Sequence, residues 1–205
     1  MPLRAVISRK ESRNGRWFAV FVGIVMLASV AAYVFSINPS SQAGNFRYAG
    51  LTFRQDAQGF YASEFKGQPL NFNYKPESVS DVTLPEGTVQ KLTGTTSLQM
   101  TYYWNSSLAQ RMALFELDAS NILDAKYGIF IQPGFTTPNP LKQPVITCAN
   151  ATSFVPVLFM QEANNTAIGL DSSNSNCIIV NASSDANFAR VSERILYAIL
   201  AGPGK

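Results

Sequence analysis

The feature that most constrains this chain is an uninterrupted apolar run near its start. Residues 17–37 (WFAVFVGIVMLASVAAYVFSI) contain no charged side chain. A helix of that length rises about 30 Å, which matches the hydrocarbon core of a bilayer. The run therefore predicts a transmembrane helix over residues 17–37, with the lipid bilayer as a partner.

The charges on either side of this run predict its orientation. Only Glu11 is acidic among residues 1–16, and the first charge after the run is Arg47. The basic residues before it are Arg4, Arg9, Lys10, Arg13 and Arg16. Because basic segments stay on the cytoplasmic side, residues 1–16 are predicted to form a cytoplasmic tail. The chain is thus expected to be a single-pass protein of the cell membrane with an extracytoplasmic C-terminal domain.

Two alternatives for the apolar run stay open. A cleaved secretory signal would use Ser41-Gln42-Ala43 before Gly44 as its small-residue cleavage site, although the run is longer than the roughly 7 to 15 residues of a signal core. A pilin-like leader would be cut near Gly15. The sequence alone does not decide whether the segment is removed.

A strand-rich region is predicted after a short polar linker at residues 38–45. Residues 46–97 begin with alternating aromatic residues, whose period of two is typical of half-buried strands in a small antiparallel meander. Two interpretations of the aromatic side chains are possible: a sheet with an ordinary core, or an exposed patch that grips a sugar or a protein. Proline and glycine in residues 75–97 indicate a connector.

Residues 98–202 are predicted to form an α/β subdomain. A strand over residues 98–104 precedes a helix that begins near Asn105 or Ser106 and ends at Gly128. Further strands are expected at VITC, VPVLFMQ, TAIGLD and CIIVN, before a last helix that starts at residues 183–185. This order predicts an α/β (α+β) fold in which a mixed sheet is covered by two helices.

The two cysteines, Cys148 and Cys177, both follow the apolar run. An even number of cysteines in an oxidising compartment predicts one disulfide bond, and no CxxC spacing indicates a redox pair. Four N-x-[ST] sequons mark possible glycosylation sites: Asn105, Asn150, Asn164 and Asn181.

Two resemblances bear on the second half of the chain. The stretch VPVLFMQEANNTAIGLD, followed by CIIVN and a terminal helix, resembles the end of a thioredoxin-like domain, with Val155-Pro156 opening a strand that turns back as a hairpin. The active CxxC is missing, so the resemblance does not imply dithiol exchange. The overall layout, ending in TC, VPV, NCIIV and RILYAIL, resembles an uncharacterised archaeal single-pass membrane-anchored protein family, and this implies no particular chemistry.

The composition argues against several kinds of site. The chain has no histidine, which removes Ser-His-Asp and Cys-His nucleophiles and the usual zinc sites. It has no P-loop and no dinucleotide fingerprint, so we expect no cofactor, and without the basic tail its charge is close to neutral, so we expect no nucleic acid partner. Glu116 and Asp118, two residues apart on a helix, are interpreted as a solvated face, and Arg190 and Glu193 as a surface ion pair.

Two functional hypotheses remain. The first is a membrane-anchored, non-enzymatic module that acts as a subunit, an assembly factor or an envelope-interaction protein with a protein partner. The second is a membrane-anchored hydrolase of glycans or peptides, which requires two carboxylates that face each other across one cleft. No catalytic, cofactor-binding or metal-binding residue is assigned from the sequence.

Overall fold

The computed structural model of the protein describes residues 17, 21–29 and 45–203. The chain divides into two compact units, Met1–Gln42 and Ala43–Lys205, and each is described by itself.

In the first unit, the structure describes residues 17 and 21–29, and their backbone is helical. The predicted tail, both alternative cleavage sites and nearly all of the predicted linker lie outside the described residues. Among the described residues, no helix is both long enough and apolar enough to cross a bilayer. The predicted transmembrane helix over residues 17–37 is therefore wrong, and the single-pass topology and membrane location drawn from it are corrected with it.

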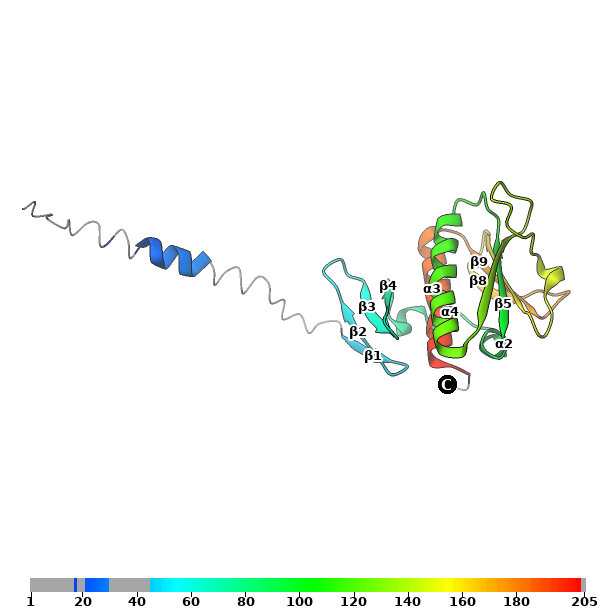
Figure 1. Ribbon diagram of the computed structural model, residues 1–205, viewed down its shortest axis with the longest axis horizontal. Helices are drawn as coiled ribbons and strands as arrows, with labels where there is room; N and C mark the ends of the chain where they lie inside the picture. The colour runs from blue at the N-terminus through cyan, green and yellow to red at the C-terminus, as the bar shows by residue number, and fades with distance from the viewer. Residues whose placement is uncertain (1–16, 18–20, 30–44, 204–205) are drawn as a thin grey trace, which may run out of the picture. The chain divides into compact units, whose positions relative to one another are not determined.

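The second unit begins with the predicted antiparallel meander (Figure 1). Its four strands, in spatial order, are β1 (Phe46–Tyr48), β2 (Leu51–Gln55), β3 (Tyr61–Phe65) and β4 (Gln68–Phe72). Two hairpins turn at Ala49-Gly50 and Lys66-Gly67, where all four residues have positive φ. This is the geometry of two-residue turns that match strand twist, and glycine is the residue that adopts it without strain.

One face of the meander is buried. Phe53 and Phe72 are almost fully buried, whereas Phe60 at the tip of a hairpin is 41% exposed. The rings of Phe53 and Phe72 pack against Tyr197 of the last helix, and the ring centroids of Phe72 and Tyr197 lie 4.5 Å apart. The aromatic residues of the meander therefore include a real core, as the first interpretation of the pattern requires. After the meander the chain forms the short helices η1 (Pro76–Val79) and α2 (Thr88–Thr93) within the predicted connector.

A five-stranded mixed sheet forms the centre of the unit. Its strands are β5 (Ser97–Tyr102), β6 (Phe130–Phe135), β7 (Val157–Glu162), β8 (Ala167–Leu170) and β9 (Cys177–Ala182). The spatial order is β6-β5-β7-β9-β8, with β8 antiparallel to β9 and every other pair parallel. The predicted α/β architecture, a small antiparallel sheet beside a mixed sheet, is confirmed.

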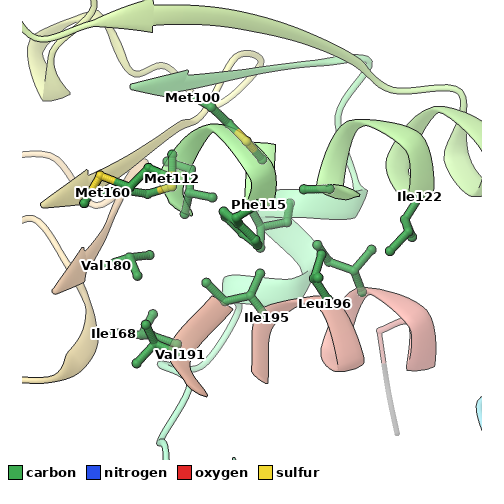
Figure 2. Packing of buried hydrophobic residues seen from close by; sticks show 14 of the residues in the cluster. Met100, Met112, Phe115, Ile122, Met160, Ile168, Val180, Val191, Ile195 and Leu196 are labelled. Atoms are coloured by element: carbon green, nitrogen blue, oxygen red, sulfur yellow. The ribbon is translucent and has the colours of Figure 1, made fainter. Parts of the chain in front are cut away.

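Two helices, α3 (Ala109–Tyr127) and α4 (Asp185–Ala201), pack against one face of this sheet (Figure 1). Figure 2 shows the core between them and the strands, including Met112 and Ile195 from the helices and Met100 from β5. Ser184 caps α4 by accepting a hydrogen bond from the backbone N–H of Asn187. The start of α3 differs from the prediction: no side chain caps it, and it begins after a turn at residues 103–108.

A long crossover between β6 and β7 lies on the other face of the sheet. It contains η2 (Cys148–Asn150), and a disulfide joins Cys148 to Cys177 at the start of β9, as predicted. The Thr101 hydroxyl donates a hydrogen bond to the Ile146 carbonyl at 2.9 Å, which fixes the crossover to β5. The strand predicted at residues 145–148 is wrong, since only Val145 forms an isolated bridge, to Phe135.

The hairpin expected from the thioredoxin-like resemblance is not formed. The strand that follows Val155-Pro156 is β7, and it does not pair with β8 although only residues 163–166 separate them. Instead β9 lies between the two, parallel to β7 and antiparallel to β8. The apolar alternation of three neighbouring strands does not specify which two pair, and the parallel register of β7 on β9 is a long-range choice.

Candidate functional site

The order of the strands creates a switch point between β5 and β7. From β5 the chain passes through α3 to β6 on one side, while β7 lies on the other side of β5. In open α/β sheets, ligands bind outside the carboxyl ends of the strands at such a point. We therefore expect a binding site at the carboxyl ends of β5, β6 and β7.

The turn that follows β5 places two large aromatic side chains at this end of the sheet. Tyr103 and Trp104 are 42% and 41% exposed, and the Tyr103 ring meets Phe159 of β7 edge to face. The hydroxyls of Ser106 and Ser107 both donate to Oε2 of Glu162, at 3.1 and 2.9 Å. These bonds tie the turn to the end of β7 and hold the aromatic residues in place.

A cavity of about 220 Å³ opens beside the same strand ends, between α3 and the edge strand β6. We call it the edge cavity. It is lined by Tyr102, Glu116, Pro133, Gly134, Phe135, Leu141 and Gln143. Tyr102 and Phe135 come together because they are paired in the parallel register of β5 and β6, and their rings lie 5.1 Å apart, edge to face.

Close packing at Gly134 brings the crossover against β6. A Cβ atom at this position would lie 2.5 Å from Cδ1 of Ile146 and 2.8 Å from the Pro144 carbonyl oxygen. The crossover also pairs with the end of β6. The Phe135 N–H donates to the Pro144 carbonyl, and the Phe135 carbonyl accepts a hydrogen bond from the Ile146 N–H. Only glycine allows this approach, which places Leu141 and Gln143 at the edge cavity.

Glu116 is the one carboxylate among the residues that line the edge cavity. Burial raises the pKa of Glu116 to about 7, because a desolvated carboxylate is disfavoured against its neutral form. Burial, and then the nearby Glu116 charge, raise the pKa of Tyr102 to about 12. Oε2 of Glu116 is buried and accepts no hydrogen bond within the described part of the chain.

A second cavity, of about 260 Å³, lies between the meander and the two helices. We call it the junction cavity. The polar residues on its wall are Asn71, Asn73, Arg111, Asp118, Ser192 and Glu193. Burial raises the pKa of Asp118 and that of Glu193. Two carboxylates therefore line one cavity.

Glu193 is fully engaged with the meander. Its Oε1 accepts hydrogen bonds from the backbone N–H and side-chain amide of Asn73, at 2.7 and 2.6 Å, and its Oε2 accepts one from the Tyr74 N–H at 2.9 Å. The side chain is only 4% exposed. The predicted surface ion pair of Arg190 with Glu193 is wrong: Arg190 pairs with Asp81 at 2.7 Å.

The interpretation of Glu116 and Asp118 as a solvated face is also wrong, since both are half-buried. They do point in different directions, as their helical spacing predicted, and line different cavities. The S-x-x-K spacing at Ser63 and Lys66 makes no Ser-Lys dyad. The Ser63 hydroxyl donates to the Thr52 carbonyl and the Lys66 ammonium to that of Ala125.

The four sequons have different environments. Asn105 and Asn164 are exposed near the carboxyl end of the sheet, and Asn150 is exposed on η2, where its side-chain oxygen accepts the Thr147 N–H. Asn181 is half-buried in β9 and accepts a hydrogen bond from Gln161. Glycosylation at the four positions stays a prediction, and Asn181 offers the least accessible amide.

Within the described ranges, no three His, Cys, Asp or Glu side chains are close enough together to hold a metal ion. Comparisons of the chain with family models, curated proteins and solved structures gave no match. The two cavities and the turn that follows β5 are therefore the features of the described chain that bear on its function.

Proposed function

We propose that the protein is a non-enzymatic interaction module, a subunit or assembly factor, that binds a protein partner at the carboxyl end of its five-stranded sheet. The observation that carries this proposal is the exposure of Tyr103 and Trp104 at the switch point. Tyrosine and tryptophan are the residues most enriched among energetic hot spots of protein interfaces. Leaving them exposed has a cost in water that burial by a partner removes.

The turn that bears these side chains is held rigidly, which favours binding. Ser106 and Ser107 fix it to Glu162, and Tyr103 packs on Phe159. An interface that is already ordered loses less conformational entropy on association than a loose one. Glu162 accepts from both serines, so this carboxylate is occupied with holding the turn.

Affinity capture after crosslinking, using the full chain as bait, tests the proposal. We expect a stoichiometric protein partner with the wild type, and recovery reduced by about tenfold or more with Tyr103→Ala/Trp104→Ala. The matched control is Phe130→Ala/Phe154→Ala, because these side chains are 67% and 82% exposed near the amino ends of the strands. Equal capture by both double variants, or no partner with the wild type, would contradict the proposal.

A carboxylate-dependent hydrolase is the second candidate, favoured by the presence of Asp118 and Glu193 in the junction cavity. Both oxygens of Glu193 are held by donors of the meander, which leaves Asp118 as the carboxylate free to act on a substrate. Hydrolysis of a glycan or peptide panel that Asp118→Asn abolishes, with the fold unchanged, would favour this candidate over the interaction module.

A further inference from the structure

The edge cavity combines apolar walls with a single carboxylate. Tyr102, Phe135 and Leu141 supply aromatic and aliphatic surface, and Glu116 supplies the one carboxylate among the residues that line it. Pockets that bind small organic ligands have this composition, mostly apolar with a few polar groups that fix orientation.

Glu116 lacks a counter-charge within the described chain. No salt bridge to it is formed by the described residues, and burial alone accounts for the raised pKa of its carboxyl group. A half-buried carboxylate without a partner is unfavourable, and a cation placed beside it offsets the cost of its desolvation. The missing partner is therefore a positive charge that a ligand can bring.

The residues that line the edge cavity favour an organic cation and not a metal ion as the ligand. A divalent metal needs several oxygen ligands, whereas Glu116 and the amide of Gln143 are the only side chains on this wall with a carbonyl or carboxylate oxygen. The Tyr102 and Phe135 rings attract an ammonium group through their π faces, and the apolar surface accommodates an alkyl chain.

We propose that the edge cavity binds an organic ammonium group, with its positive charge on the Glu116 carboxylate and its alkyl chain against Tyr102, Phe135 and Leu141. The ammonium group could belong to a free small amine or to a lysine side chain, which share this chemistry. Neither Tyr103 nor Trp104 lines the edge cavity, so this proposal does not depend on the proposed partner interface.

Titration of the isotope-labelled full chain with n-butylammonium, followed by amide NMR, tests this assignment. We expect saturable shifts at residues of the cavity wall, and binding weaker by about tenfold or more for n-butanol, which has nearly the same shape without the charge. This comparison needs no variant. Absence of shifts with n-butylammonium, or equal binding of n-butanol, would overturn the proposal.

Two variants on α3 locate the charge. Glu116→Gln keeps the shape and removes the charge, and we expect it to weaken n-butylammonium binding by about tenfold or more. Asp124→Asn, at an exposed position of the same helix, should leave the affinity unchanged. Unchanged binding by a folded Glu116→Gln variant would overturn the assignment. A lysine amide separates the two sources, with its Nε-acetylated form as the uncharged control. Tighter binding of the lysine amide than of n-butylammonium indicates that a protein side chain is the ligand. Tighter binding of n-butylammonium indicates a free amine.

Discussion

The junction between the meander and α4 differs from the edge cavity in how each treats a buried carboxylate. Glu193 and Glu116 both project from helices, and burial raises the pKa of each. Glu193 accepts three hydrogen bonds from Asn73 and Tyr74, whereas Oε2 of Glu116 accepts none from the described residues. One carboxylate is saturated by its own chain and the other is not.

This difference separates a structural role from a binding role. Hydrogen bonds to a carboxylate offset its desolvation, so Glu193 stabilises the fold by holding the two backbone N–H groups that follow β4. An unsatisfied buried polar atom in a folded protein calls for an explanation, and a bound ligand is one. The junction is therefore expected to respond to mutation through stability, and the edge cavity through binding.

Removal of an aromatic ring at the junction should have the largest effect. Phe72 is 1% exposed and stacks on Tyr197, so Phe72→Ala should lower the free energy of unfolding by about 4 kcal/mol. Denaturant unfolding measures the loss. Phe60→Ala, at an exposed position of the same meander, should change stability by less than about 1 kcal/mol. Similar small effects of both would show that the junction is not part of the cooperative core.

Truncation of the saturated carboxylate should come next. Glu193→Ala leaves the N–H groups of Asn73 and Tyr74 without their acceptor, and we expect a loss of about 3 kcal/mol. Glu162→Ala is the matched control, because Glu162 is exposed and its donors are serine hydroxyls that water can satisfy. Equal losses for the two variants would remove the distinction between a buried and a surface acceptor.

Neutralisation of the unsaturated carboxylate should have the opposite sign. The pKa of Glu116 is about 7 in the folded protein against an ordinary value of 4.5, so the folded state binds more protons and stability falls as pH rises through this window. Glu116→Gln does not titrate and should be more stable than wild type by about 1 to 2 kcal/mol at pH 8, after allowance for partial exposure, with the gain fading towards pH 4.5.

Thermal or denaturant unfolding at several pH values measures this gain. Among the residues that line the edge cavity, Tyr102 is the other titratable group, and its pKa of about 12 keeps it neutral throughout the window. Asp124→Asn, at an exposed position of α3, serves as the control and should show no comparable gain at pH 8. A Glu116→Gln variant that is less stable than wild type at pH 8 would mean that its carboxylate has a partner after all.

Local patterns predicted much of the fold. Alternating aromatic residues predicted the meander, and Gly128 predicted the end of α3. The even number of cysteines, without a CxxC spacing, predicted the disulfide. The predicted membrane span was wrong, because no helix in the part of the chain that the structure describes is long and apolar enough to cross a bilayer.

Long-range contacts could not be predicted in the same way. The donors of Glu193 are Asn73 and Tyr74, more than a hundred residues earlier in the chain, so its burial depends on how the meander docks. The surroundings of Glu116 depend on the path of the crossover, because Leu141 and Gln143 line the same cavity and Gly134 permits the close approach of the crossover to β6. A charged residue on a helix is usually exposed, and both exceptions arise from tertiary packing that overrides this tendency.

The smallest predicted effect sharpens the account of the junction. Tyr197 donates its hydroxyl to the Tyr74 carbonyl at 2.7 Å, so Tyr197→Phe should cost about 1 kcal/mol while keeping the ring packing. The same residue, Tyr74, donates its N–H to Glu193. If both bonds hold one rigid segment, the double variant Tyr197→Phe/Glu193→Ala should lose less than the sum of the single losses, because the first break already frees the segment. Additive losses in denaturant unfolding would instead mean that the two bonds act independently, and that Glu193 stabilises its two N–H groups without fixing the docking of the meander.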